Sequence, residues 1–257
     1  AVLKEGLYED SERKELLLDL CRFVTNETDD FISLSEYLEK MPESQKDIYY
    51  IASETSAQAK ASPHLEGFKS KNIPVLIMTD AIDQFWLPMI GSFKDKKFVS
   101  ITQGQINLDD LDAKNKDNKN EDTDKKDKKD KEFIDLIAQM KVVLGDQVKD
   151  IRLSSKLTDS PVCLVADDGD MDIAMEQLMA QRDTNYKGAP RILEINGDHS
   201  LIKNMKSLLS KKENSDLISD AGTLLFEQAR LMEGKMPSDP GQFSKIMNQF
   251  LLKVIKD

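Results

Sequence analysis

The amino-acid sequence predicts two folded modules, of mixed α/β and α+β class, joined by a charged linker. Before residue 109, short apolar runs alternate with helical segments, which is typical of a small, largely parallel sheet between helices. The stretch Asp109–Lys131 consists almost entirely of Asp, Lys, Asn and Glu. After residue 199, only amphipathic helical segments follow. The predicted domains are therefore residues 1–108, a linker at residues 109–131, and residues 132–257.

The predicted linker, Asp109–Lys131, has no aromatic residue and nearly balanced charges. Such a segment buries too little apolar surface to offset the entropy lost on ordering, so we expect it to be flexible. The alternative is a solvated extension of the helix that we predict from Glu132 onwards. In both cases the segment separates two folded modules.

The first module is predicted to follow a β-α-β-α-β order after a helical start. Ser33 and Glu36 have the spacing of a capping box, and Ser62-Pro63 is a typical helix start. Asp80 is expected to cap a helix over Ala81–Ile90. Right-handed crossovers then give a small, largely parallel, three-stranded α-β-α module. Its predicted strands are Ile48–Ile51, Val75–Met78 and Lys97–Ile101.

The second module, from Glu132 onwards, is predicted as a mixed α+β module that ends in helices. Asp239 and Pro240 are typical first residues of a helix. Apolar residues occupy more than one side of this last helix, so it needs more than one neighbour. The predicted strands are Ile151–Leu153, Val162–Val165 and Ile192–Ile195, and the predicted helices are Met171–Ala180, Ser200–Leu209, Asp216–Glu233 and Pro240–Ile255.

Composition excludes several classes of partner. The formal net charge of −11 over 257 residues disfavours nucleic acid and anionic membranes as partners, because both present negative phosphates. No apolar run approaches the roughly 18 residues that a membrane-spanning helix needs. Cys21 and Cys163 lie in apolar surroundings and are expected to be reduced core thiols of a cytoplasmic protein. Since the chain does not start with Met, we expect it to be a piece of a longer protein.

Signatures of catalysis and metal binding are weak. His64 and His199 have no Cys or second His at zinc-ligand spacing, and no G-x-S-x-G motif occurs. The turn after Ile48–Ile51 has no glycine, which disfavours a phosphate-binding loop. A triad that assembles only in the folded chain stays open. We predict no catalytic residue and no metal site.

Asp167–Asp172 is a dense acidic loop, and carboxylates are the ligands that calcium prefers. The loop does not have the spacing of an EF-hand. A turn at Gly169, followed by Asp170 as the cap of the next helix, explains the same residues and is the favoured interpretation.

A methionine-rich stripe follows this loop at helical spacing. Met171, Met175, Leu178 and Met179 share one face of the predicted helix. One interpretation is core packing. The other is an adaptable surface for varied partners, because unbranched thioethers repack easily against different shapes. The spacing alone leaves both open.

Six motifs, in order along the chain, are characteristic enough to compare with known families. They are AVLKEG at residues 1–6, MPESQKDIYYI at 41–51, SPHLE at 62–66, DAID at 80–83, VKDIRL at 148–153 and LTDSP at 157–161. In this order they resemble the ninety-kilodalton heat-shock chaperone family, and its bacterial, HtpG-like form in particular. The first four motifs resemble the end of the family's middle domain, and the last two resemble its carboxyl-terminal dimerisation domain.

The resemblance implies part of a homodimeric, ATP-dependent chaperone of the cytoplasm. Such a protein assists folding, takes part in the stress response and binds unfolded proteins, called clients. The family binds ATP in an amino-terminal domain that this sequence does not resemble. The resemblance therefore implies no ATPase activity and no cofactor for this chain, whereas ATP and magnesium are expected for the full-length protein.

The resemblance also assigns binding residues. The methionine-rich helix corresponds to a client-contact helix, and a second client-contact patch matches Phe85 and Trp86. Here the sequence departs from the usual bacterial pattern, and Pro88 is expected to disrupt the helix. The client-binding residues are Met171, Met175, Leu178, Met179, Phe85 and Trp86. The dimerisation residues, on the last two helices, are Leu217, Ala221, Leu224, Leu225, Phe243, Ile246, Met247, Phe250, Leu251 and Val254.

Two alternatives remain open. The chain could be a structural dimerisation scaffold in which the methionine-rich helix is buried and binds no client. A small molecule could also bind at the carboxyl ends of the first module's strands, the usual ligand position in open parallel sheets. The sequence offers no convergent set of polar residues for such a ligand.

Overall fold

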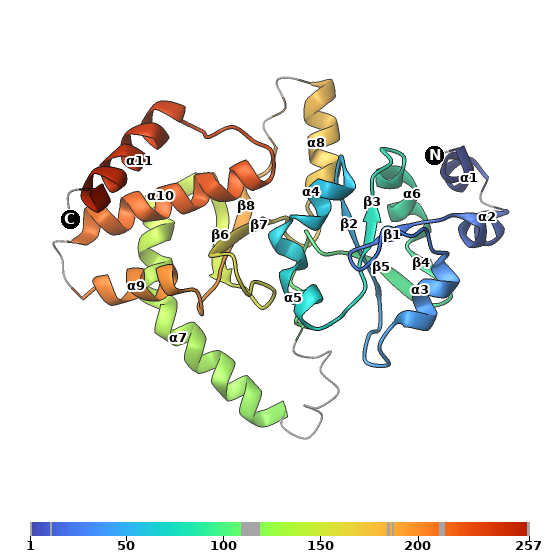
Figure 1. Ribbon diagram of the computed structural model, residues 1–257, viewed down its shortest axis with the longest axis horizontal. Helices are drawn as coiled ribbons and strands as arrows, with labels where there is room; N and C mark the ends of the chain where they lie inside the picture. Colours follow the sequence, from blue (N-terminus) through green and yellow to red (C-terminus); the bar gives the residue numbers. More distant parts are fainter. Residues whose placement is uncertain are drawn as a thin grey trace. The chain divides into compact units, whose positions relative to one another are not determined.

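The computed structural model describes residues 2–10, 12–108, 119–183, 186, 188–210 and 214–255, with only the backbone of residues 119–130. The chain forms two compact units (Figure 1). Unit 1 contains Ala1–Lys116 and Ala166–Ala189, and unit 2 contains Asp117–Val165 and Pro190–Asp257. Each unit combines a sheet with helices, which confirms the predicted fold class. The predicted domain boundaries stay a prediction, and they differ from the units in the place of Ala166–Ala189.

The sheet of unit 1 has five strands in the order β1-β3-β2-β5-β4. The three central strands, β3, β2 and β5, run parallel, as the sequence predicted, and helices lie between them in the sequence. The predicted count of three was wrong, since an antiparallel two-residue strand is added at each edge. The strands are β1 (Val24–Thr25), β2 (Ile48–Ala52), β3 (Leu76–Met78), β4 (Ser92–Phe93) and β5 (Lys96–Ser100).

Alternate residues of the central strands point to two separate cores. Ile48 of β2 packs with Leu76 and Met78 of β3 in one buried cluster. Tyr49 and Ile51 face the opposite side and pack in another. The first cluster is covered by α1 (Val2–Glu9), α2 (Lys14–Leu20), α3 (Leu34–Lys40) and α6 (Asp83–Ile90), and the second by α4 (Ser56–Lys60), the 3-10 turn Pro63–Leu65 and α5 (Glu66–Ser70).

Local capping signals were read correctly at several helix starts. Ser33 and Glu36 form the predicted capping box, with the Ser33 hydroxyl accepting from the Glu36 N–H at 3.2 Å. Ser62 caps the turn that begins at Pro63. The cap at Asp80 was wrong. Helix α6 begins later, at Asp83, and has no side-chain cap.

Unit 2 contains a three-stranded sheet in the order β6-β8-β7. β8 (Arg191–Ile195) is central, with β6 (Val148–Leu153) parallel and β7 (Val162–Val165) antiparallel to it. All three predicted strands are confirmed. The helices of the unit are α7 (Lys119–Leu144), α9 (Ser200–Leu208), α10 (Ser215–Met232) and α11 (Pro240–Ile255).

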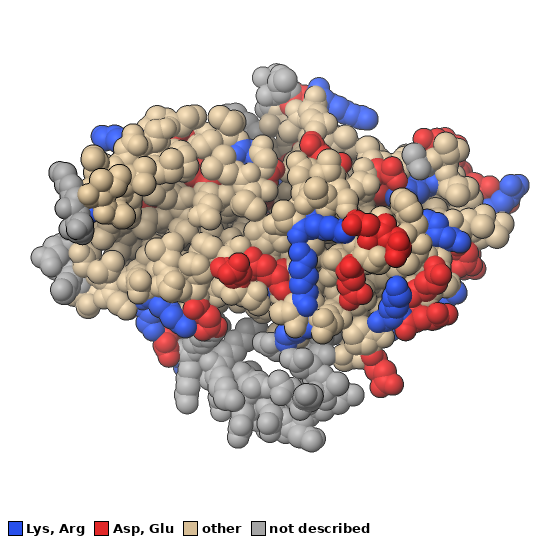
Figure 2. All heavy atoms as spheres, viewed as in Figure 1, with Lys and Arg blue, Asp and Glu red and all other residues tan. Residues whose placement is uncertain are grey.

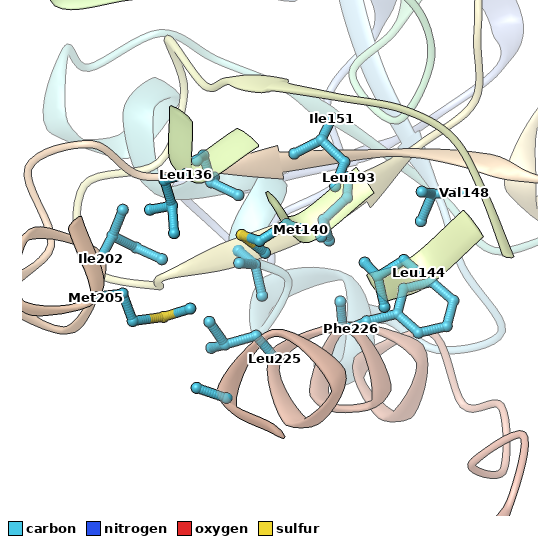
Figure 3. Packing of buried hydrophobic residues seen from close by; sticks show 14 of the residues in the cluster. Leu136, Met140, Leu144, Val148, Ile151, Leu193, Ile202, Met205, Leu225 and Phe226 are labelled. Atoms are coloured by element: carbon cyan, nitrogen blue, oxygen red, sulfur yellow. The ribbon is translucent and has the colours of Figure 1, made fainter. Parts of the chain in front are cut away.

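One apolar core joins the helices of unit 2 to its sheet (Figure 3). Leu136, Met140 and Leu144 of α7 lie one turn apart and point into this core. Ile151 of β6 and Leu193 of β8 line it from the sheet side. Further members from α9 and α10 are Ile202, Met205, Leu225 and Phe226. The sheet and the helices therefore form a single folded body.

The predicted linker falls partly within α7. Residues 119–131 belong to this helix, which is the helical extension that the sequence left open as an alternative. Residues 109–118 lie outside the described residues.

Candidate interaction surfaces

Trp86, a predicted client-contact residue, lies in the core of unit 1. Its side chain is 0% exposed, with ring centroids 5.5 Å from Phe98 and 6.4 Å from Phe23. The indole Nε1 donates to Asp83 Oδ1 at 2.8 Å. The sequence could not distinguish this position from Phe85, because adjacent aromatic residues on a helix point in different directions. The structure places Trp86 where it stabilises the fold, and not on a surface open to a partner.

Asp83, which holds Trp86, belongs to a buried ion-pair network between α1 and α6. The Lys4 ammonium lies 2.9 Å from Asp83 and 2.8 Å from Asp80, and 4.9 Å from the centroid of the Phe23 ring. Burial raises the pKa of Asp83, and this outweighs the opposing effects of Lys4 and of the Trp86 hydrogen bond. Burial also acts on Asp80, but there the hydrogen bond and charge of Lys4 prevail and lower the pKa. The network fixes α1 against the start of α6.

Phe85 lies on the outer side of α6 and is half-buried. It contacts Tyr8 of α1 edge to face at a centroid distance of 6.3 Å, and Met89 follows it one turn later on the helix. Pro88 does not disrupt this helix, contrary to the prediction, since α6 continues to Ile90. The helix is held by its buried residues, and Gly91 ends it with a left-handed φ of 67°.

The methionine-rich helix α8 (Ile173–Arg182) belongs to unit 1. Its buried residues are Ile173 and Glu176. Met175, Leu178 and Met179 are half-buried, while Met171 precedes the helix and is 39% exposed. The predicted stripe is thus neither part of a core nor fully open to solvent.

The cap of α8 is Asp172, and not Asp170 as predicted. Its Oδ1 accepts from the Ala174 N–H at 2.9 Å. Its Oδ2 accepts from the hydroxyl groups of Ser100 and Thr102, at and just beyond the carboxyl end of β5. Reasoning from the sequence missed both hydroxyl residues, because they lie about 70 residues before the helix that they contact. No local pattern marks such a pairing.

The predicted dimerisation residues of α10 divide into two groups. Ala221 and Leu225 are buried in the core of unit 2, where they stabilise the fold of the unit itself. Leu217 and Leu224 are half-buried, and Leu231, at the same seven-residue spacing, is 42% exposed. The side of α10 that carries these leucines is therefore only partly covered by the described residues of the chain.

Most of the large apolar side chains of α11 are exposed to solvent. Ile246 is buried, and Phe243 and Phe250 are half-buried. Five further apolar side chains are exposed, from 43% for Met247 to 77% for Ile255; the other three are Leu251, Leu252 and Val254. In the view of Figure 2, the surface of α10 and α11 carries few charged side chains, whereas acidic and basic residues are dense over unit 1. An apolar helix face with so few charges fits contact with another protein.

Other kinds of site find little support in the part of the chain that the structure describes. No group of three or more His, Cys, Asp or Glu side chains there is arranged to hold a metal ion. Within the same residues, no helix combines the length and the apolar character that crossing a bilayer requires.

Comparison with known proteins gives a consistent result. A family model described as Hsp90 protein matches residues 1–256. The chain is 41% identical over 244 residues to the chaperone protein HtpG of Roseobacter denitrificans, covering 94% of this chain and 39% of that protein. It is 40% identical over 265 residues to HtpG of Wolbachia pipientis wMel, covering 99% and 40%. For HtpG of Streptomyces coelicolor, the identity is 36% over 248 residues, covering 96% and 38%. The chain spans about two fifths of the length of these relatives.

Proposed function

The chain belongs to the Hsp90 protein family, and on this basis we propose that it is the self-associating, client-binding part of an HtpG-type chaperone. In this proposal it corresponds to the end of the middle domain and the carboxyl-terminal domain of that chaperone. The protein would assist folding in the cytoplasm and take part in the stress response. Its partners would be a second copy of itself and partly folded client proteins.

The exposed apolar face of α11 is the observation that carries the proposed self-association. Its five exposed side chains are 43–77% exposed, so burying what is still open on each of two protomers would contribute on the order of 10 kcal/mol, at about 2 kcal/mol for a side chain that goes from fully exposed to fully buried. Association costs roughly 4–15 kcal/mol in lost freedom of motion, so α11 alone gives a weak dimer. Leu217, Leu224 and Leu231 of α10 have the spacing to supply further contacts. Both helices together support a helical dimer interface.

Self-association is tested by placing charges in this face. The double variant Leu251→Glu with Val254→Glu introduces two carboxylates at exposed apolar positions, and Gln249→Glu is the matched control at an exposed polar position of the same helix. In sedimentation equilibrium over a concentration series, we expect dimers for the unmodified chain and the control and monomers for the double variant. A monomeric unmodified chain at every concentration would refute the proposed dimer.

Client binding is supported by the half-buried state of the α8 stripe. Met175, Leu178 and Met179 keep part of their surface in solvent, which a purely structural core helix does not need. Phe85 and Met89 of α6 offer a second apolar surface, with Met89 57% exposed. Contacts of this kind are weak individually and tolerate varied sequences, as a chaperone requires.

The scaffold alternative predicts a different response to mutation. We expect Met175→Gln with Met179→Gln to suppress aggregation of a denatured model client less well than the unmodified chain, with unchanged circular dichroism. Ala180→Gln, at an exposed position of the same helix, is the control. Loss of the fold in the methionine variant would instead support a structural role for the stripe. Unchanged suppression by a folded variant would exclude α8 as a client contact.

We also propose that this chain alone does not hydrolyse ATP, since the resemblance assigns the ATP site to another domain. A phosphate-release assay with the purified 257-residue chain, ATP and magnesium tests this. Turnover above the background of a buffer control would contradict it.

A further inference from the structure

We propose that Asp172 is a positioning residue that fixes α8 at the carboxyl edge of the unit 1 sheet, through the hydroxyl groups of Ser100 and Thr102. The proposal rests on the proposed client-contact role of α8. It extends that role to residues that hold the helix in place without touching a client.

The two carboxylate oxygens of Asp172 have separate partners. Oδ1 accepts from the Ala174 N–H and so caps the helix, as Asp does at many helix starts. Oδ2 accepts from the Ser100 Oγ and, at 3.0 Å, from the Thr102 Oγ1. An ionised carboxylate only accepts hydrogen bonds, and each hydroxyl has one hydrogen to donate. The helix start and the strand end therefore share one carboxylate, with complementary donors on both sides.

The contact lies where the parallel strands end. Ser100 is the last residue of β5 and is 4% exposed; Thr102 lies two residues later and is 6% exposed. At the other end of α8, the Gln181 Nε2 donates to the Glu54 Oε1 at 3.0 Å, and Glu54 lies just beyond β2. β2 and β5 run parallel, so both attachments lie at the same edge of the sheet. The usual ligand position of an open parallel sheet is thus occupied by a helix of the chain itself.

The loop that precedes α8 is held at this edge by hydrogen bonds to residues 102–104, and none of these bonds involves a residue of the helix itself. The Ala166 N–H donates to the Thr102 carbonyl at 2.9 Å, and the Gly104 N–H donates to the Ala166 carbonyl at 2.8 Å. The Gln103 Nε2 donates to the Asp170 carbonyl at 2.7 Å. Asp172 is the residue that connects this edge of the sheet to the first turn of α8.

The two attachments of α8 differ in expected strength. Hydrogen bonds from buried hydroxyls to a charged carboxylate are among the stronger ones, whereas an exposed amide–carboxylate contact competes with water. The buried start of α8, rather than its exposed end, should therefore decide how firmly the helix is held. Removing both hydroxyls should raise local opening of α8 by roughly tenfold or more.

Hydrogen–deuterium exchange on the 257-residue chain tests this. Ser100→Ala with Thr102→Val removes both donors and leaves Asp172 in place as the cap. Thr79→Val with Ser92→Ala, at two exposed positions of unit 1, is the matched control. We expect about tenfold faster exchange in the amides of α8 for the first variant only, with β1 and β3 unchanged. Unchanged exchange in α8, or an equal increase throughout unit 1, would overturn the proposal.

Two further measurements keep the outcome decisive. If the double variant does not fold, Thr102→Val alone removes one donor, and a smaller increase confined to α8 is expected; no increase would overturn the proposal. Aggregation suppression by Met175→Gln with Met179→Gln is measured in parallel. The methionine variant could suppress aggregation as well as the unmodified chain while the hydroxyl variant shows faster exchange in α8. That result would refute client contact by α8 and leave the positioning role of Asp172 supported.

Discussion

Lys4→Met is expected to destabilise unit 1 strongly, because it breaks a buried ion pair. Methionine keeps most of the apolar stem of Lys4 and removes its charge, which leaves the fully buried Asp83 without a cation. Breaking a buried ion pair from one side costs about 3–5 kcal/mol. Asp80 adds little, because its side chain is 36% exposed and such pairs contribute about 0–1 kcal/mol. We therefore expect a loss of about 3 kcal/mol or more at neutral pH.

The loss should depend on pH in a defined direction. In the variant, the carboxyl of Asp83 is buried without Lys4, so its pKa rises further above the unfolded value. The folded variant then binds a proton more readily than the unfolded chain, and its stability falls as the pH rises from the ordinary aspartate range through the raised pKa. The difference between Lys4→Met and the unmodified chain should accordingly shrink as the pH is lowered from 7.5 to 5.

Urea unfolding followed by tryptophan fluorescence measures this loss. Trp86 is the single tryptophan of the chain, and it is buried beside Asp83, so the signal reports on unit 1. Lys14→Met, which removes an exposed charge from α2, is the control and should change the free energy of unfolding by less than about 0.5 kcal/mol. A loss below about 1 kcal/mol for Lys4→Met, or one that is independent of pH, would refute the reasoning.

Three further predictions concern other parts of the chain. Arg152→Met removes two hydrogen bonds, of 3.1 and 2.8 Å, to the buried Glu194 and should destabilise unit 2 by about 2 kcal/mol, measured by thermal unfolding in far-ultraviolet circular dichroism; an unchanged Tm would contradict it. Glu227→Ala removes the acceptor of the Ser238 N–H, which holds the loop between α10 and α11. A looser loop should weaken self-association roughly fivefold in sedimentation equilibrium, and unchanged dimerisation would show that this hydrogen bond does not affect the dimer interface. Gly104→Ala forces a side chain onto a φ of 67° and should cost about 1–2 kcal/mol in urea unfolding, and a neutral effect would be the contrary result.

Much of the fold could be predicted because its signals are local. The runs Ile48–Ile51 and Val162–Val165 are apolar, short and followed by turn residues, and both are strands. Ser33 and Asp239 cap helices through residues three positions away, so a short window contains both partners. The edge strands β1 and β4 were missed because each has only two residues, and their pairing depends on neighbours distant in the sequence.

The candidate sites were harder to predict because they depend on partners far along the chain. Asp80 has the local pattern of a helix cap, yet its carboxylate pairs with Lys4, which no local window contains. Trp86 and Phe85 are equivalent by residue type, and only the packed core shows that the first is buried. Asp172 precedes a helix like many other aspartates, and its contact with Ser100 became visible only in three dimensions. Periodicity on α11, in contrast, correctly indicated apolar residues on more than one side.

Both compact units are assembled from two separate stretches of sequence. Within the described residues, the chain changes from one unit to the other after residues 165 and 189. On a ribosome, which releases the amino-terminal end first, unit 1 is still without α8 when the chain has emerged only as far as residue 165, and unit 2 is still without its central strand β8. Neither unit can therefore be completed before part of the other has been synthesised. Truncating the chain at one end alone does not give an intact unit. A gene that expresses one of them alone must therefore encode both of its stretches.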